Sequence, residues 1–445
     1  MMFFVSLTAL LGAFIAVSRS SAAGSAADAL GGLWCESVLA EYDLPLQQRY
    51  HIFGFYGSCR ETPMRLDFYA ERDFREKKYI DYEGSRVYLD EYSLGSSERM
   101  KDQMVRAGKL IAAKKLLLPD QETVENGEEA DETQKGGKGK HAEKGAGTAA
   151  PHPMAERTGV IANQAVLSTL PSSGASAGWQ KDKIIGAVKG LSSLKNAVRK
   201  GSDRYFLDRY LFALYRDHIH DKNLEACCFE NEIEYIICGH PDDQKNLDGV
   251  KHRIIAVREA LNLMFVLEDP EMNEKTLAMA EALTPGPAAA ATQKLLQAGW
   301  ALAESYNDYQ LLIQGKRVPL RKDRQSWAID LRSIVASGKN KGKKDGKEDS
   351  EKGGEVVLKK EVPCVDPGNS RGKTYEDYLR FFVSLTGEEL QLLRMMDLMQ
   401  INMQYGWYED FLLRDHYSGI EAVFKVNGKD YTSRREYFPE NMKGE

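Results

Sequence analysis

The sequence is poor in cysteine, with 6 residues among 445. So low a density excludes a small scaffold held together by disulfides. An excess of one charge sign is also missing, because 60 Lys and Arg stand against 66 Asp and Glu, a net charge of −6. Nucleic-acid-binding proteins usually carry a basic balance or a basic stripe, so we expect no nucleic-acid partner. The 42% apolar content excludes a wholly disordered chain.

Long apolar runs are scarce too, and the exception is Met1–Val17, which has no charged residue. Its length is at the short limit for a helix that crosses a bilayer, which needs about 20 residues. A buried core helix, a cleaved signal peptide and a retained anchor are the competing interpretations. Ala22 and Ala23 offer small residues for cleavage, but the basic segment that opens a signal peptide is missing. We favour a retained anchor. The positive-inside rule does not support this interpretation, because Arg19 follows the apolar run and no Lys or Arg precedes it.

Two segments are almost without large apolar side chains. Pro119–Ala155 is acidic at first and then rich in Gly and Lys, and Ser337–Gly354 mixes Gly and Lys with acids. Neither can bury enough apolar surface to offset the entropy of the chain, so we predict that both are disordered. The basic run Lys341–Lys347 is interleaved with acids, which is typical of a solvated loop.

Elsewhere the pattern is mainly helical, with apolar residues at helical spacing and capping residues at the starts. Thr386 and Glu389 have the spacing of a capping box. The predicted helices are Ser96–Leu118, Arg204–His218, a long helix capped by Asp242 or Asp243, a helix that starts at Asp269-Pro270 and runs to Leu283, Ala288–Tyr306, Thr374–Leu385 and Gly387–Gln404.

Strands are predicted at two places. Glu232–Cys238 alternates, with its isoleucines and Tyr235 on one side, and Gly239 ends it. Ile420–Val426 also alternates, and the Asn427-Gly428 dipeptide that follows is the strongest short hairpin signal in the chain. Tyr431–Tyr437 would be the return strand.

Two recognisable catalytic motifs are absent, because the chain has no H-E-x-x-H and no S-x-x-K set with its partners. Gly368–Thr374 ends in Gly-Lys-Thr before a predicted helix, but it has three residues between its glycines where a phosphate-binding loop has four. A flexible entry to the helix is the better interpretation. We therefore predict no catalytic and no cofactor-binding residues.

Cysteines and histidines gather in one region, and they are the ligand types that zinc prefers. Their spacings do not fit a zinc ribbon or finger, so we predict no metal site. Disulfides among the six cysteines stay open, since no pairing can be chosen from the sequence. The residues concerned are His218, His220, Cys227, Cys228, Cys238 and His240, with Cys35, Cys59 and Cys364 elsewhere.

Methionines recur at helical spacing near the C-terminus, at Met395, Met396, Met399 and Met403. Such a row could form an adaptable binding face. Packing between two helices is the more usual reason for it, and we predict a core role.

Several blocks together resemble a bacterial family of unknown function whose members are similar to TadE/TadG-like pseudopilins. The family is associated with tight-adherence (Tad) pilus gene clusters. The blocks are Val5–Leu11, Ser37–Asp43, Tyr50–Gly57, Glu232–Leu247, Arg253–Leu267, Trp300–Asp308, Gly315–Leu320 and Tyr375–Leu379. The resemblance implies an N-terminal helix that anchors the subunit and packs into an assembly, and it implies no catalytic residues. Leu30, Leu33, Trp34, Val38 and Leu39 are available to pack the second half of that helix.

The expected fold is therefore α+β and predominantly helical. A single membrane-spanning helix precedes an extracytoplasmic body with a few short strands and a C-terminal β-hairpin. The expected divisions are 1–42 for the anchor helix, 43–118 for the first part of the body, 119–155 for a disordered linker, 156–336 for a helical core region, 337–373 for a second linker and 374–445 for the C-terminal helices and hairpin.

The expected function is a non-catalytic structural or assembly component of a Tad-like pilus or secretion apparatus, with protein partners in that assembly. It would lie in the cell membrane through Met1–Val17, with its body extracellular. A membrane-tethered or secreted ligand-binding or sensor module unrelated to pili is the alternative.

Overall fold

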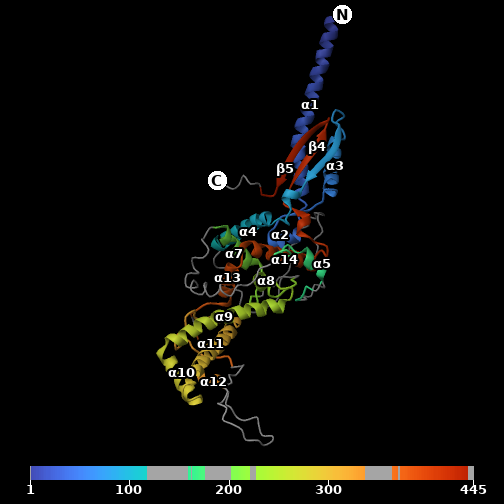
Figure 1. Ribbon diagram of the computed structural model, residues 1–445. Helices are drawn as coiled ribbons and strands as arrows, with labels where there is room; N and C mark the ends of the chain where they lie inside the picture. Colours follow the sequence, from blue (N-terminus) through green and yellow to red (C-terminus); the bar gives the residue numbers. More distant parts are fainter. Residues whose placement is uncertain are drawn as a thin grey trace, which may run out of the picture.

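The computed structural model describes residues 2–117, 159–161, 163–175, 202–220, 227–335, 363–368 and 371–438. Figure 1 shows an elongated molecule in which helix α1 (Met2–Leu39) projects from one end. A small sheet follows, then a central layer of helices, and helices α9–α12 form the opposite end. The predicted fold class is confirmed, because helices predominate and the strands form two small sheets.

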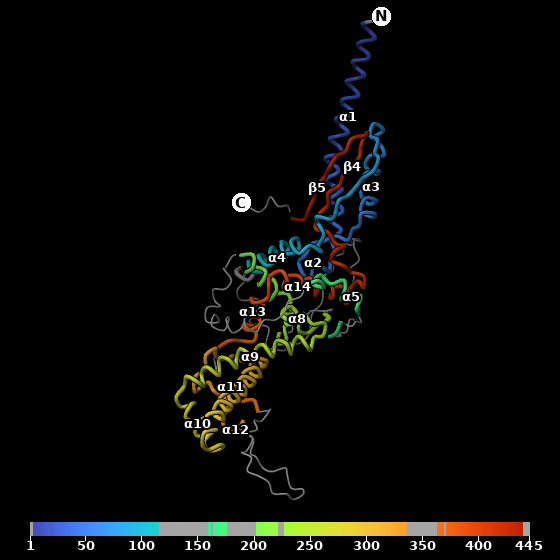
Figure 2. The backbone as a smooth tube through the Cα atoms, in the orientation of Figure 1, coloured from blue at the N-terminus to red at the C-terminus, as the bar shows by residue number. Residues whose placement is uncertain are grey.

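The end next to α1 is built from both ends of the chain. Strands β2 (Tyr82–Tyr88), β4 (Gly419–Val426) and β5 (Lys429–Glu436) form an antiparallel sheet in the order β2-β4-β5. Helix α3 (Glu61–Phe74) and the second half of α1 pack with this sheet, as Figure 2 shows. The predicted C-terminal hairpin is confirmed, with Asn427 at φ 50° and Gly428 at φ 74° in its turn.

The central layer holds the largest hydrophobic core. Helix α14 (Glu388–Gly406) lies in it with its methionines Met395, Met396, Met399 and Met403 buried, which confirms their predicted core role. The elements of this layer are α2 (Leu44–Tyr50), α4 (Ser97–Leu117), α5 (Gln164–Thr169), α7 (Asp203–Leu214), α8 (Glu232–Cys238), α13 (Tyr375–Leu385), α14 (Glu388–Gly406) and η3 (Leu413–Asp415). The turn η1 (Asp90–Tyr92) and the strand pair β1 (Phe55–Tyr56) and β3 (His416–Tyr417) lie outside this core, and Phe55 and Tyr417 belong to the core of the sheet end.

The far end is an antiparallel arrangement of α9 (Asp243–Glu268), α10 (Pro270–Leu283) and α11 (Ala289–Ile313), with the short α12 (Leu331–Ile334) beside α11. The predicted caps are present here. Asp242 accepts a hydrogen bond from the backbone of Lys245, and Asp269 accepts one from Met272. A core separate from the central one fills this end, with Trp300 and Leu296 at its centre.

The predicted strand Glu232–Cys238 is wrong, because these residues form helix α8. Glu232 through Ile237 are all buried, so the alternation did not mark one buried face. The buried carboxylates accept backbone hydrogen bonds, Glu232 from Arg216 and Glu234 from His218. Gly239 ends the helix in the left-handed conformation at φ 72°.

Two smaller expectations also need correction. The capping box predicted at Thr386 is not formed, because Gly387 is the N-cap of α14 and makes no side-chain cap. A capping box instead starts α13, between Thr374 and Asp377. The helix predicted over Arg204–His218 ends at Leu214, since the next residue, Tyr215, is extended and buried in the central core.

The predicted disordered segments Pro119–Ala155 and Ser337–Gly354 lie outside the described residues. Within the expected linker 337–373, residues 363–368 and 371–373 are described and contact the body. Asn307 exchanges two hydrogen bonds with the backbone of Val365, at 2.8 and 2.9 Å. Lys373 exchanges two backbone hydrogen bonds with Val318.

Candidate functional site

The most unusual surface of the molecule is the first half of α1. Every residue from Phe3 to Arg19 is exposed, and the exposed fractions of Phe3, Leu10 and Phe14 are 82%, 71% and 74%. Soluble surfaces rarely carry so large a continuous apolar area. By length and composition the helix can cross a membrane, with a mean hydropathy of 1.7. The described part of its uncharged stretch, Met2–Val17, extends for about 24 Å, somewhat less than the hydrocarbon core of a bilayer, which is about 30 Å thick.

The second half of α1 is fixed to the sheet. Ala23, Ala27, Cys35 and Val38 are buried against it, and Trp34 lies edge-on to Phe74 and to Phe424 at 5.3 and 5.1 Å between ring centroids. The Trp34 Nε1 donates to Asp73 at 2.8 Å. Of the residues expected to pack here, Leu33 is 55% exposed and Leu30 is half-buried.

Glycines on α1 let the helix approach the strands closely. A Cβ at Gly31 would lie 2.8 Å from the Ser433 hydroxyl and 3.0 Å from the Phe424 ring. A Cβ at Gly24 would lie 2.8 Å from the Tyr431 hydroxyl. Helix and sheet therefore form one rigid unit from which the apolar half projects.

A buried charge network holds the far end of the body together. Arg258 on α9 contacts Asp308 on α11 at 2.8 Å, and Lys322 lies between Asp308 and Glu304. The side chains of all four are at most 1% exposed. Arg258 also donates to the carbonyls of Pro319 and Leu320, while Glu304 accepts from the backbone of Ala328 and Ile329.

The charges in this network balance, two cations against two anions. Burial raises the pKa of Glu304, while at Asp308 the charges of Arg258 and Lys322 outweigh burial and lower the pKa. The network fixes residues 316–329 on the α9–α11 pair, which is a structural task. The sequence analysis did not predict this network. Two features could have indicated it, namely Arg258 within the apolar stripe of its helix and the four-residue spacing of Glu304 and Asp308.

A second buried acid lies between α8 and α13. Glu234 Oε1 accepts from the Tyr375 hydroxyl at 2.7 Å and from the His218 backbone at 3.1 Å, and its Oε2 has no hydrogen-bond partner among the described residues. Burial raises the pKa of Glu234 to about 8, against these hydrogen bonds, which lower it. Both Glu234 and Tyr375 are buried, so the described residues shield this carboxyl from solvent.

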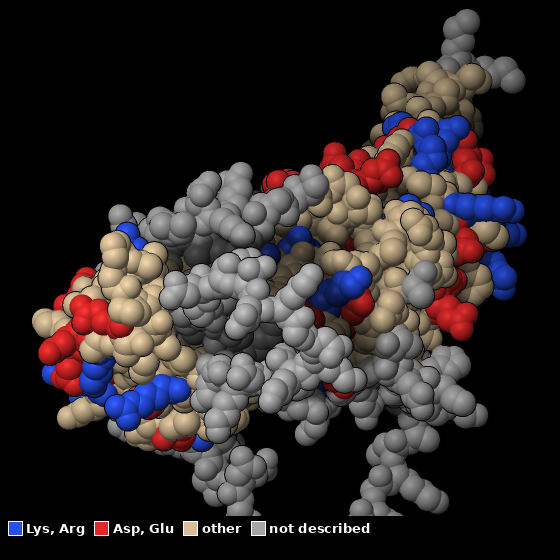
Figure 3. All heavy atoms as spheres, turned by 60° about the horizontal axis from the view of Figure 1, so that its bottom comes forward, with Lys and Arg blue, Asp and Glu red and all other residues tan. Residues whose placement is uncertain are grey.

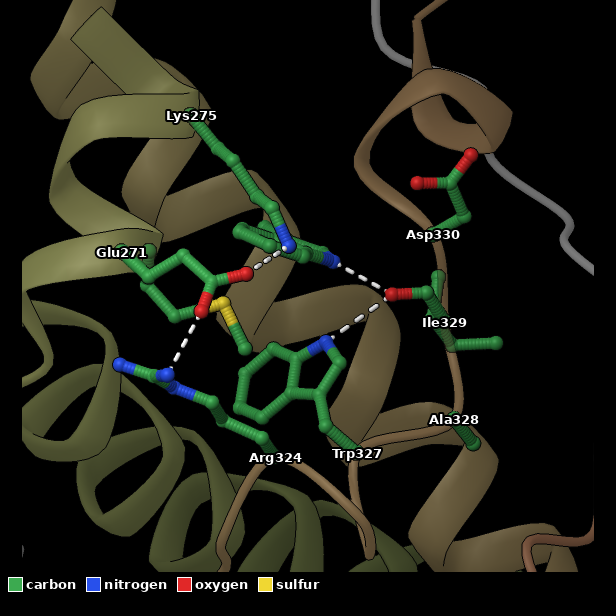
Figure 4. A pocket seen from close by; sticks show the side chains of 9 residues that line it. Glu271, Lys275, Arg324, Trp327, Ala328, Ile329 and Asp330 are labelled. Carbon is green, nitrogen blue, oxygen red and sulfur yellow. Dashed lines mark hydrogen bonds and ion pairs between the residues drawn. The ribbon is translucent and has the colours of Figure 1, made fainter.

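A cavity of about 230 Å³ opens at the far end, between α10 and residues 324–330. The indole nitrogens of Trp300 and Trp327 both donate to the carbonyl of Ile329, at 2.7 and 2.9 Å. Figure 4 shows Trp327 and Ile329 joined in this way. At its mouth Glu271 pairs with Lys275 and Arg324, at 2.8 and 2.6 Å. Hydrogen bonding to Lys275 and the Arg324 charge lower the pKa of Glu271, so the carboxylate is ionised and offsets both cations.

The cysteines and histidines considered as zinc ligands do not converge. Within the described residues, no group of three or more His, Cys, Asp or Glu is placed to hold a metal ion. His218 contacts Asn231 and His220 contacts Asp217, both at about 3 Å. All six cysteines are described, and no disulfide joins any of them.

The Gly372-Lys373-Thr374 segment is explained by packing. Gly372 has φ 148°, and a Cβ there would lie 2.4 Å from the carbonyl carbon of Val318. The glycine thus allows the backbone pairing of Lys373 with Val318, and Thr374 caps α13.

The comparisons with known proteins give a family and no function. A family model described as "Family of unknown function (DUF5702)" matches residues 154–428, which is more than half of the chain. The match covers α5 through strand β4 and the turn that follows it, and it includes neither β5 nor α1. No curated protein and no solved structure matches the chain.

Proposed function

The chain belongs to the DUF5702 family of unknown function, and we propose that it is a membrane-anchored, non-catalytic structural component of a Tad-like pilus or secretion apparatus, with its body outside the cell. The observation that carries this proposal is α1. Its first half is apolar and exposed, and its second half is buried against an antiparallel sheet.

Each half of α1 has a separate task in this proposal. The exposed half lies in the bilayer, or against the same helix of neighbouring subunits during assembly, because its apolar surface is stable only away from water. The buried half transmits force and position from that helix to the body. Val5–Leu11 and Ser37–Asp43 resemble a family of unknown function whose members are similar to TadE/TadG-like pseudopilins, and this resemblance supports the same assignment.

Membrane fractionation with a carbonate wash tests the anchor, and the exposed cysteines test the orientation. Cys59 and Cys364 are exposed while Cys228 is buried. A maleimide that cannot cross membranes should label intact cells at Cys59 and Cys364 and leave the Cys59→Ser/Cys364→Ser variant unlabelled. Labelling only after lysis would place the body inside the cell and contradict the proposed orientation.

The ligand-binding alternative rests on the cavity beside Trp300 and Trp327. A second cavity of about 500 Å³ adjoins it through Lys275 and Asp330. Cross-linking separates the two functions, because a structural subunit should form multimers through α1. If the protein is a structural subunit, a photo-reactive residue at position 10 should cross-link it into a ladder of multimers in native membranes. If it is a sensor, no ladder should form, and Trp327→Ala should impair ligand binding.

A further inference from the structure

Two loops lie together at the end of the sheet from which α1 projects. Asn427, in the β4–β5 turn, exchanges hydrogen bonds with Asp81, in the α3–β2 loop, with both distances 2.8 Å. The Asn427 amide also donates to the carbonyl of Tyr79 at 3.3 Å. In Figure 1 this end of the sheet points along α1 toward the N-terminus.

The position of this end along α1 follows from the packing. Strand β5 and α1 run in the same direction, since Gly24 approaches Tyr431 and Gly31 approaches Ser433. Lys429 precedes Tyr431 by two residues, about 7 Å of strand, which equals four to five residues of helix. Lys429 therefore lies near the level of Arg19, where the uncharged part of α1 ends.

Several basic side chains gather at this level. Arg19, Arg75, Lys78 and Lys429 are exposed, and Lys77 is half-buried over the Phe74 ring at 5.6 Å. None of these five has an ion-pair partner among the described residues.

The acids that face these cations are fewer. Glu83 pairs with Lys425 and Asp430 pairs with Arg86, at 2.6 and 2.8 Å. Three acids remain, namely Glu76, Asp81 and Glu71, which acts electrostatically on Tyr82 at the start of β2, so five cations stand against three acids. Figure 3 shows cations and acids interspersed over the face of the body that it presents.

We propose that this end of the sheet, which we call the collar (Arg19, Lys77, Lys78, Tyr79 and Lys429), binds the headgroups of anionic phospholipids. The inference rests on the proposed membrane insertion of α1. Tyr79 is 42% exposed and is of the type that gathers at membrane interfaces. Each basic residue near an anionic surface contributes about a fivefold preference.

The length of α1 brings the collar to that surface. Met2–Val17 spans about 24 Å as a helix, which is shorter than a hydrocarbon core of about 30 Å. A short span is accommodated by thinning the bilayer and by drawing flanking residues to the interface. The collar lies beside α1 at the point where the apolar part of the helix ends. A bilayer that is thicker than this apolar part would therefore bring its headgroups into contact with the collar.

The test uses the full chain in vesicles of phosphatidylcholine, with or without phosphatidylglycerol. Lysines are acetylated with a reagent that cannot cross the bilayer, and the modified sites are quantified by mass spectrometry. Lys78 and Lys429 should react about fivefold more slowly when phosphatidylglycerol is present, and high salt should remove the difference. Lys275, exposed at the far end of the molecule, is the control and should react equally in both.

A double variant adds a second readout. Lys78→Gln/Lys429→Gln should abolish the slower reaction of Lys77 in phosphatidylglycerol vesicles, while Lys275→Gln should leave it. Suppose that Lys78 and Lys429 are acetylated at equal rates in both vesicle types while the protein stays in the membrane after carbonate extraction. This result would overturn the proposed lipid binding by the collar and would be consistent with α1 as the anchor. Release of the protein by carbonate would overturn the anchor and the collar together.

Discussion

Glu234 is a buried carboxyl that is more easily protonated in the folded protein than in the unfolded chain. The pKa of Glu234 is about 8 in the folded protein, compared with the ordinary value of 4.5 that applies to the unfolded chain, so the folded state binds the proton more tightly. The free energy of unfolding should therefore fall as pH rises from about 4.5 to about 8, with a slope of up to about 1.4 kcal/mol per pH unit from this group. The full contribution is present below pH 4.5 and is lost above 8.

Glu234→Gln keeps the shape of the protonated acid and removes the titration. Urea unfolding across this pH range should show a smaller slope for the variant and higher stability than the parent protein at alkaline pH. Glu274→Gln, at an exposed position of α10, serves as the control and should change neither. An unchanged slope for Glu234→Gln would show that this acid is not protonated in the folded state.

Asp308 separates two buried cations and should be among the most sensitive positions in the body. Asp308→Ala leaves Arg258 and Lys322 without their shared anion, and we expect it to lower the free energy of unfolding by about 3–5 kcal/mol. The Arg258→Met/Asp308→Ala pair should cost less than the two single changes added together, because it leaves fewer charges buried without a partner. Additive costs in urea unfolding would argue against a coupled network.

At the scale of elements, Trp34 and Leu33 form a matched pair on α1. Trp34 fills the space between Phe74 and Phe424, whereas Leu33 is 55% exposed. Trp34→Ala should therefore destabilise the sheet end by about 3–5 kcal/mol, and Leu33→Ala by less than about 0.5 kcal/mol. Hydrogen exchange in β4 measures the effect locally. Equal costs for the two changes would contradict the helix orientation described above.

Elements with a strong local period were predictable from the sequence. Helices α4, α9, α10, α11, α13 and α14 and the β4–β5 hairpin follow from spacing, caps and the Asn-Gly turn. Strand β2 was not predicted, since Gly84 and Ser85 interrupt it, its register shifts between Tyr82 and Gly84, and its partner β4 lies far away in the chain. Helix α8 was mistaken for a strand because it is buried on every side, so burial left no helical period to read.

The candidate site was predictable only in its apolar part. Met1–Val17 stands out in any reading of the sequence, while the collar is formed by residues near 19, 77–79 and 429 that meet only through the sheet. The Arg258–Asp308–Lys322–Glu304 network likewise depends on three separate segments. Charged residues that come from separate segments have no characteristic sequence spacing, so their proximity in the fold cannot be recognised from the sequence.

At the scale of the whole molecule, the membrane-facing part and the body should be separable. Phe3–Arg19 is exposed throughout, and Ala23 is the first fully buried residue of α1. Deleting residues 2–18 removes this apolar surface and keeps every residue that packs on the sheet. The shortened protein should be soluble, with a free energy of unfolding within about 0.5 kcal/mol of the full chain measured in detergent.

The same deletion should abolish membrane retention after carbonate washing, because the remaining contacts with lipid are those of the collar. These are electrostatic, so the shortened protein should bind phosphatidylglycerol vesicles weakly at low salt and dissociate at high salt. A deletion of Ala23–Leu39 is the matched comparison and should unfold the sheet end, since it removes Trp34 and Val38 from that core. A large loss of stability on deleting residues 2–18 would mean that the projecting half of α1 supports the body, and the division into an anchor and a body would then be wrong.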